Sequence, residues 1–215
     1  PALADAVDAA TADAILEEAA KVTSHLIAPL NRSGDEEGAQ WLDGNVSTPI
    51  GFKQAYATYI EGGWVGLSGN TDFGGMGMPK MLAVQFEEML YGANSSFALY
   101  SALSSGACLA LDAHASDTLK NLYLPPMYEG RWAGSMCLTE AHAGTDLGLI
   151  RTRAEPQADG SFLITGSKIF ITGGDQDLTE NIVHLVLAKL PDAPAGPKGI
   201  SLFVVPKVLV NADGS

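Results

Sequence analysis

Residues 136–148, MCLTEAHAGTDLG, decide how we interpret the rest of the chain. The first of them alternate like a strand, because Met136 and Leu138 fall on one face and Cys137 and Thr139 on the other. A loop of small and polar residues follows. A strand that ends in such a loop can bring backbone N–H groups and short hydroxyls close to an anionic or planar ligand. The stretch therefore predicts a binding site at the end of a strand.

A second stretch, residues 168–174 (KIFITGG), lies a hairpin further along the chain. We expect residues 162–172 to form two strands joined by a turn at Gly166 and Ser167. Phe170 and Thr172 would then share one face of the second strand. An aromatic ring beside a hydroxyl suits a flat heteroaromatic ligand, whose face packs while its polar edge forms hydrogen bonds. A half-buried hairpin with a core phenylalanine is the alternative for this stretch taken alone.

Together the two stretches resemble the binding signatures of the acyl-CoA dehydrogenase family. In that family the first is usually L-T-E-P-x-A-G-S-D and the second K-x-W-I-T-N-G. This chain departs from the first at Ala141-His142, where Pro-Gly is more common, and at Thr145, which replaces a serine. It departs from the second at Phe170, where tryptophan is more common. Two signatures in the family's order are much more specific than either one alone.

The resemblance implies FAD as the cofactor and gives each residue a role by its position. Thr139 would contact the pyrimidine side of the flavin, and Thr172 would reach its redox-active edge. Thr145 would lie near the cofactor pyrophosphate and the CoA end of the substrate. The implied cofactor-binding residues are Met136, Leu138, Thr139, Gly144, Thr145, Phe170, Ile171 and Thr172. Phe97 and Ser101 would join Thr145 as substrate contacts and form walls of a slot for the acyl tail, although ordinary helix packing explains this pair equally well.

The family's reaction is the FAD-dependent α,β-dehydrogenation of an acyl-CoA thioester to the trans-2-enoyl-CoA. Its base is a glutamate in a C-terminal helical domain. We expect that domain to be missing here, so no catalytic residue is assigned, and this fragment alone should be inactive. Glu140 and Asp146 are predicted to hold the loop by hydrogen bonds. Glu140 is a poor candidate for the base, because its charge would oppose the charge that a nearby flavin gains on reduction.

The resemblance also implies partners and leaves other functions open. It implies an acyl-CoA substrate, an electron-transfer flavoprotein or similar acceptor, and a homodimer or homotetramer at full length. His142, Thr145 and a long loop at residues 31–48 resemble larger bacterial members with an extra C-terminal domain, including enzymes acting on methylthio-substituted acyl-CoAs. The alternatives are an acyl-CoA oxidase or flavin-dependent monooxygenase of the same fold, and a non-catalytic ligand-binding module.

Helical patterns fill the first part of the chain and strand patterns the second, which predicts an α+β fold. We expect an N-terminal all-helical bundle at residues 1–132 and an incomplete middle β domain, a barrel or sandwich, at residues 133–215. Helices are expected at residues 4–29, 49–61, 79–91, 96–113 and 116–125, with Pro29 ending the first. Residues 31–48 would form a polar loop, anchored in a core by Trp41. Strands are expected at residues 133–139, 151–155, 162–165, 169–172, 182–190 and 199–205.

Composition narrows the classes of function. The 215 residues include 47% apolar and 17% charged residues, as in a domain with an ordinary buried core, and the net charge is −13. That charge argues against a nucleic-acid surface, which needs clustered lysine and arginine. The four histidines lack the spacing of metal ligands, so no metal site is predicted. We also predict two free buried cysteines, no membrane span and a cytoplasmic location.

Overall fold

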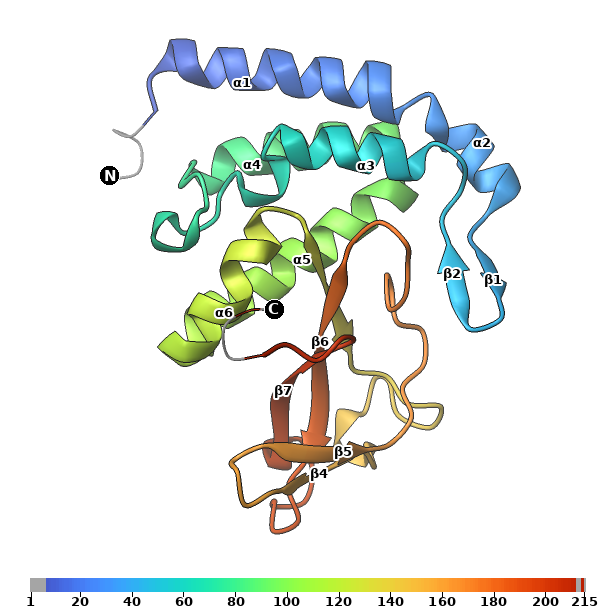
Figure 1. Cartoon of the computed structure of the whole chain (residues 1–215), viewed down its shortest axis with the longest axis vertical. Coiled ribbons are helices and arrows are strands. Elements are labelled where there is room, and N and C mark those ends of the chain that lie inside the picture. The colour runs from blue at the N-terminus through green and yellow to red at the C-terminus, as the bar shows by residue number, and fades with distance from the viewer. Residues whose placement is uncertain (1–6, 212–213, 215) are drawn as a thin grey trace.

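The computed structural model describes residues 7–211 and 214, and the predictions for residues 1–6, 212, 213 and 215 lie outside the described residues. Six α-helices precede the main sheet in the described part of the chain, and Figure 1 shows helices and sheet in separate halves of the molecule. The predicted α+β class is confirmed. The helices are α1 (Ala9–Lys21), α2 (Leu30–Glu37), α3 (Phe52–Glu61), α4 (Lys80–Ala93), α5 (Ser95–His114) and α6 (Asp117–Tyr128).

The first helical region is longer than the sequence pattern suggested. After α1 the chain continues through a π-helical stretch (Val22–Ile27) into α2, so Pro29 does not end the helical region. Pro29 lies at the N-cap of α2, where the missing N–H of proline costs no helix hydrogen bond. A proline pattern alone does not distinguish the end of one helix from the start of the next.

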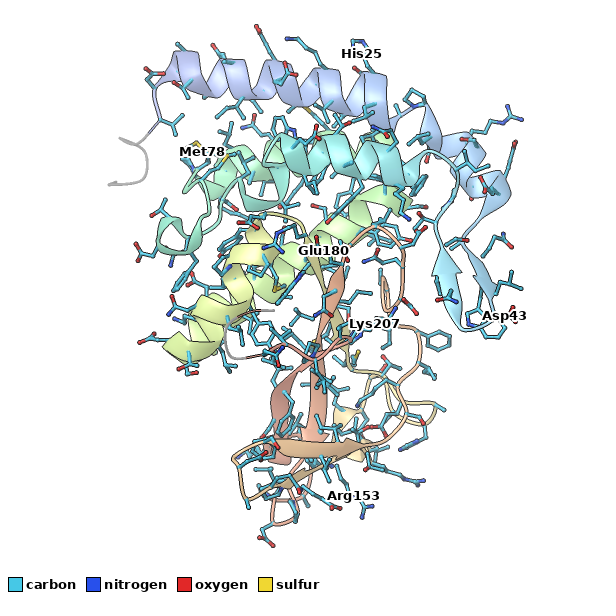
Figure 2. All side chains as sticks on the ribbon, viewed as in Figure 1. His25, Asp43, Met78, Arg153, Glu180 and Lys207 are labelled. Atoms are coloured by element: carbon cyan, nitrogen blue, oxygen red, sulfur yellow. The ribbon has the colours of Figure 1, made fainter. Side chains whose placement is uncertain are left out.

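A β-hairpin interrupts the predicted loop at residues 31–48. Its strands, β1 (Gln40–Leu42) and β2 (Asn45–Ser47), pair antiparallel. Asp43 has a φ of 50° in the turn between them, and Figure 2 shows it at the tip, away from the helices. Trp41 is 72% exposed on this hairpin, so the prediction that it anchors the segment in a core is wrong.

The helices pack around aromatic side chains. The ring of Phe97 on α5 lies edge-on to Phe52 at 5.6 Å and to Tyr59 at 5.8 Å between ring centroids, both on α3. Asn94 caps α5 by accepting a hydrogen bond from the Phe97 N–H at 3.0 Å. The N-terminal end of α5 is thus fixed in the centre of the helical core.

Helix α6 extends past the two prolines that were predicted to end it. It runs through Pro125 and Pro126 to Tyr128. Leu124 and Met127 have no exposed surface and pack in a second apolar cluster with Trp132 of the sheet. The burial of these large side chains offsets the helix hydrogen bonds that the prolines remove. None of the helices in the described part of the chain has both the length and the apolar character needed to cross a membrane.

The main sheet has five strands in the described residues, with β6 at its centre. Strand β6 pairs parallel with β3 along its first part, antiparallel with β7, and briefly with β4, which continues into a hairpin with β5. The strands are β3 (Trp132–Cys137), β4 (Arg153–Pro156), β5 (Phe162–Thr165), β6 (Asn181–Lys189) and β7 (Ile200–Pro206). A domain boundary between residues 132 and 133 stays a prediction. Both cysteines, Cys108 and Cys137, are free and buried, as predicted.

Helix α5 approaches β3 closely at Gly134. A Cβ added there would lie 2.5 Å from the Cβ of Ala107 and 3.1 Å from the Cα of Ser104. The Gly134 N–H also donates to the Ser104 hydroxyl oxygen at 3.0 Å. This contact fixes α5 relative to the strand that leads into the first signature.

Gly134→Ala should destabilise the fold, because the new methyl group cannot fit between β3 and α5 without moving one of them. We expect a loss of about 2 kcal/mol in the free energy of unfolding, measured by urea denaturation. Gly92→Ala is the matched control, because a Cβ at Gly92 in α4 meets no atom within 4 Å. An equal effect of both substitutions would contradict the close approach.

Candidate cofactor and substrate site

The first signature is held in place by the buried carboxylate of Glu140. Its oxygens accept hydrogen bonds from the N–H groups of Arg151 (2.7 Å) and Thr152 (2.9 Å) and from the Thr152 hydroxyl (2.6 Å). Lys168 donates to the same carboxylate at 3.0 Å. Ala143 exchanges two backbone hydrogen bonds with Glu140 and closes the loop. The predicted structural role of Glu140 is confirmed.

The surroundings of Glu140 keep its carboxyl ionised. Burial acts to raise the pKa of Glu140, but the hydrogen bonds from Thr152, Arg151 and Lys168 outweigh burial and lower the pKa to about 2. A carboxylate with so low a pKa is a weak base, and donors of the protein already occupy its oxygens. Glu140 therefore organises the loop rather than accepting a proton.

The second signature is joined to the first by Lys168 and by one backbone hydrogen bond. Besides its ion pair with Glu140, Lys168 donates to the Leu138 carbonyl oxygen at 3.1 Å. The Ile169 N–H donates to the Thr139 carbonyl oxygen at 2.9 Å. The two signatures, separated by about 30 residues in the chain, are therefore direct neighbours in space.

Residues 169–172 do not form the predicted strand. Phe170 has a φ of 58°, which belongs to the left-handed region, and the Gly174 N–H turns back to the Ile171 carbonyl oxygen at 3.1 Å. Phe170 and Thr172 therefore do not share a strand face. The Phe170 side chain is 87% exposed, so no burial within the described residues offsets its unfavourable backbone conformation.

Three threonine hydroxyls of the signatures are free to bind a ligand. Within the described residues, the side chains of Thr139, Thr145 and Thr172 make no hydrogen bond to the protein. A Cβ on Gly144 would lie 3.4 Å from the Thr139 methyl group, so the glycine leaves the approach to Thr139 open. Free hydroxyls beside an open position fit a planar group with polar edges, as the resemblance implies.

The other predicted cofactor contacts lie at different depths. Leu138 is half-buried, and the Met136 side chain packs against the apolar cluster that includes α5 and α6. Ile171 lines a hollow of about 400 Å³ together with Cys137 and His184.

The loop residues His142 and Asp146 are engaged within the loop. Asp146 accepts a hydrogen bond from the Gly148 N–H at 3.0 Å, so its predicted structural role is confirmed. The Nε2 atom of His142 lies 3.1 Å from the Leu149 carbonyl oxygen and 3.5 Å from a Glu140 oxygen. His142 is exposed at this position and makes local contacts only.

Phe97 and Ser101 lie inside the helical core. Phe97 is 1% exposed, and the Ser101 hydroxyl oxygen is 2.5 Å from the Tyr59 hydroxyl oxygen. The second signature instead faces Tyr100, because a Cβ on Gly173 would lie 3.4 Å from the Tyr100 ring. A substrate along the free surface of α5 would therefore meet other residues than the predicted pair.

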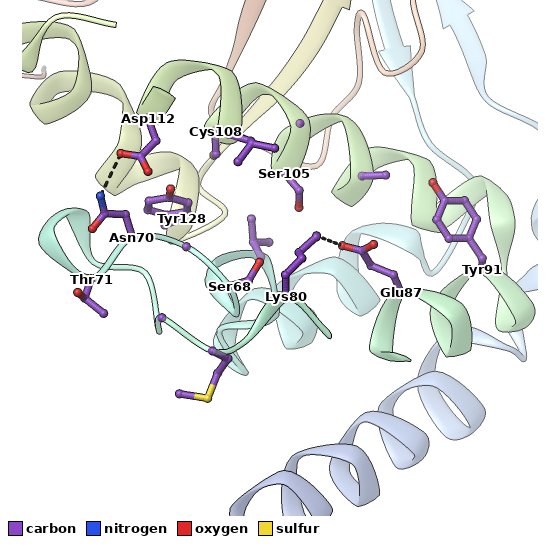
Figure 3. Close-up of a pocket in the computed structure, with 17 residues that line it drawn as sticks. Ser68, Asn70, Thr71, Lys80, Glu87, Tyr91, Ser105, Cys108, Asp112 and Tyr128 are labelled. Atoms are coloured by element: carbon purple, nitrogen blue, oxygen red, sulfur yellow. Dashed lines mark hydrogen bonds and ion pairs between the residues drawn. The ribbon is translucent and has the colours of Figure 1, made fainter. Parts of the chain in front are cut away.

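A hollow of about 740 Å³ lies between α4, α5 and the loop that precedes α4 (Figure 3). Helix α5 lines it with the small residues Ala102 and Gly106, which leave room along the helix. Polar pairs also lie in its lining, Lys80 with Glu87 (2.8 Å) and Asn70 with Asp112 (3.0 Å). The α5 wall of the hollow is thus mainly small and apolar, with Ser105 and Asp112 as its polar members.

Sequence reasoning quoted Lys168 only as the first residue of the second signature, with no role, and it did not single out Tyr100 or Asp177. Lys168 carries a detectable signal, because a lysine at the start of an apolar stretch needs a buried partner. Tyr100 and Asp177 carry none, since their contacts depend on how the helices and the second signature meet.

Comparisons with known proteins agree with this architecture. Residues 9–131 match the family model described as acyl-CoA dehydrogenase, N-terminal domain, and residues 135–213 match the one described as acyl-CoA dehydrogenase, middle domain. A helical domain followed by a mixed sheet domain, with these two matches in order, defines the acyl-CoA dehydrogenase class of fold. The chain belongs to the acyl-CoA dehydrogenase family.

Individual relatives support the same conclusion. The chain is 48% identical over 203 residues to 3-methylmercaptopropionyl-CoA dehydrogenase of Ruegeria pomeroyi, covering 94% of this chain and 34% of that protein. It therefore spans about a third of the length of this curated relative.

Solved structures show the same fold. Glutaryl-CoA dehydrogenase from Mycobacterium smegmatis has a TM-score of 0.74 and 26% identity, covering 94% of this chain and 47% of that chain. An acyl-CoA dehydrogenase complexed with FAD from Bacillus anthracis has a TM-score of 0.73 and 21% identity, covering 93% of this chain and 31% of that chain. The second likeness shows the fold alone.

Glu140→Gln should remove a pH-dependent part of the stability. Because the folded pKa of about 2 lies below the ordinary value of 4.5, the ionised carboxylate stabilises the fold fully above about pH 5. This contribution, about 3 kcal/mol, is lost progressively as the pH falls from about 5 to about 2. Urea denaturation between pH 7 and pH 2.5 should therefore show a smaller decline for Glu140→Gln than for the wild type. Parallel declines in the two proteins would contradict the assignment.

Proposed function

We propose that the full-length protein is an FAD-dependent dehydrogenase that oxidises an acyl-CoA thioester to the trans-2-enoyl-CoA. The observation that carries the proposal is the junction of the two signatures through Lys168 and the bond between Ile169 and Thr139. Through this junction Thr139 of the first signature is a direct neighbour of Ile169 in the second. Membership in the family and the relatives named above support the class of reaction.

The residues proposed to hold the cofactor form two groups, one for the flavin ring and one for phosphate oxygens. The hydroxyls of Thr139 and Thr172 would donate to the polar edge of the flavin ring, and the exposed Phe170 ring would pack on it. Thr145 would bind phosphate oxygens near the CoA end, with Gly144 leaving space for their approach. When bound, the flavin supplies an acceptor for the hydride that leaves the β-carbon.

The acyl tail is proposed to lie along the free surface of α5. Ala102 and Gly106 carry little or no side chain and open onto the hollow of Figure 3. They are better candidates for the wall of the slot than Phe97 and Ser101, whose side chains are turned into the helical core. The apolar wall suits a hydrocarbon chain.

The proton acceptor is not assigned to a residue of this chain. Glu140 has a lowered pKa, and Asp146 is bound to the N–H of its own loop. We further propose that an electron-transfer flavoprotein or similar acceptor reoxidises the enzyme, and that the full-length protein is a homodimer or homotetramer.

The full-length protein should purify with flavin absorbance that an acyl-CoA bleaches under anaerobic conditions. Thr139→Val and Thr172→Val should each retain less flavin, because each substitution removes one hydroxyl donor. Reoxidation by an artificial acceptor without peroxide supports a dehydrogenase. Rapid oxygen consumption with peroxide would show an oxidase, and a protein that binds no flavin would overturn the proposal.

Gly106→Leu should shorten the slot for the acyl tail. We expect KM for a long acyl-CoA to rise about tenfold or more, with little change for a four-carbon acyl-CoA. The fold should tolerate the substitution, because a Cβ at Gly106 meets no atom within 4 Å. Gly92→Leu is the control, since Gly92 is equally unobstructed and does not line the hollow. Equal KM changes for both chain lengths would contradict this location.

A further inference from the structure

The segment that follows the second signature is anchored to the helical part of the protein by Asp177. One oxygen of its carboxylate accepts hydrogen bonds from the Thr48 N–H at 2.9 Å and from the Thr48 hydroxyl at 2.7 Å. The other oxygen lies 3.3 Å from the ammonium group of Lys53 in the first turn of α3. The bonds from Thr48 join residues 129 positions apart in the chain.

Asp177 completes a two-ended attachment of the second signature. At the near end, Lys168 and Ile169 bind the first signature. At the far end, Asp177 binds Thr48, where the hairpin of β1 and β2 returns toward α3. Figure 1 shows this hairpin beside the loop that leads from β5 to β6. The residues between the two ends have no regular secondary structure, so their position depends on such side-chain attachments. Asp175 adds an ion pair with Lys207 after β7, which leaves Asp177 as the attachment to the helical part of the protein.

The chemistry of Asp177 suits an attachment point rather than a ligand contact. Its side chain is 31% exposed, and both oxygens are already used by the protein. Burial acts to raise the pKa of Asp177, but hydrogen bonds from Thr48 and Lys53 outweigh it and hold the pKa below the ordinary value. Bonds to an ionised carboxylate are stronger than bonds to a neutral amide, so an asparagine would hold the segment less firmly.

We propose that Asp177 is a positioning residue, which fixes where Phe170 and Thr172 stand by tying the far end of the second signature to Thr48 and α3. It acts on the ligand only through that segment. The measurements of FAD binding and flavin potential rest on the proposed function. The hydrogen-exchange measurement rests only on the contacts of Asp177 with Thr48 and Lys53.

The test uses the full-length protein with Asp177→Asn and Thr48→Val, which each weaken the attachment. Thr48→Ser keeps both hydrogen bonds to Asp177 and is the conservative rescue. Asp43→Asn at the hairpin tip is the charge control. The readouts are Kd for FAD binding to the apoprotein, the flavin midpoint potential, and amide hydrogen exchange of peptides covering residues 168–177 in the apoprotein.

We expect Asp177→Asn and Thr48→Val to weaken FAD binding about tenfold and to shift the midpoint potential. Exchange in residues 168–177 should also be about tenfold faster, since each substitution weakens the attachment by about the strength of one hydrogen bond. Thr48→Ser and Asp43→Asn should behave like the wild type. A lower melting temperature with unchanged Kd, potential and exchange would overturn the proposal. If the wild type binds no flavin, the proposed function fails, and exchange then decides on Asp177 alone: faster exchange supports the attachment and unchanged exchange overturns it.

Discussion

The structure of the candidate site depends on the compensation of one buried charge. Glu140 is 4% exposed, and an ionised carboxylate at such depth is stable only if donors surround it. Those donors come from Arg151 and Thr152 before β4 and from Lys168 in the second signature. Three separate segments must therefore meet at this carboxylate. As a result, loops without regular secondary structure are held in defined positions.

Strand β3 connects the buried carboxylate of Glu140 to the helices. β3 carries the first signature at its C-terminal end, and Gly134 in its interior presses against α5. The hollow beside α5 and the two signatures are therefore parts of one packed unit. A displacement of α5 would move both the proposed acyl slot and Tyr100, which faces the second signature. Close packing of a glycine against a helix thus supports the geometry of a binding site on the same strand.

The order of elements was predictable from sequence, because apolar residues at helical spacing and alternating strands reflect burial directly. The backbone conformation of the second signature was not predictable in this way. Residues 170–172 alternate like a strand, although Phe170 takes a left-handed conformation. The prediction that Trp41 is anchored in a core was wrong for a related reason. Residue type alone does not show that a hairpin leaves this aromatic side chain in solvent.

Helix α5 shows why the depth of a site residue is harder to predict than its presence. Apolar side chains lie all around this helix, so spacing alone does not say which face meets the core. Phe97 and Ser101 share the face that packs on α3, whereas Leu99 and Leu109 remain exposed. The resemblance predicts by position which helix would carry the acyl slot, but only the packing of α3 and β3 fixes the rotation of that helix.

The charges around the signatures suit the binding of a ligand better than the acceptance of a proton. A base for a weakly acidic C–H group needs a carboxyl with a raised pKa, which requires burial without donors. Two carboxylates near the signatures have the opposite environment: Glu140 and Asp177 have lowered pKa values because hydrogen bonds surround them. Free hydroxyls at Thr139 and Thr172 add further donors, which favour negative charge on a ligand. Such a surface suits the electron-accepting group of the proposed function. Under the proposed function, the proton would therefore go to a carboxyl in a less polar environment than that of Glu140 or Asp177.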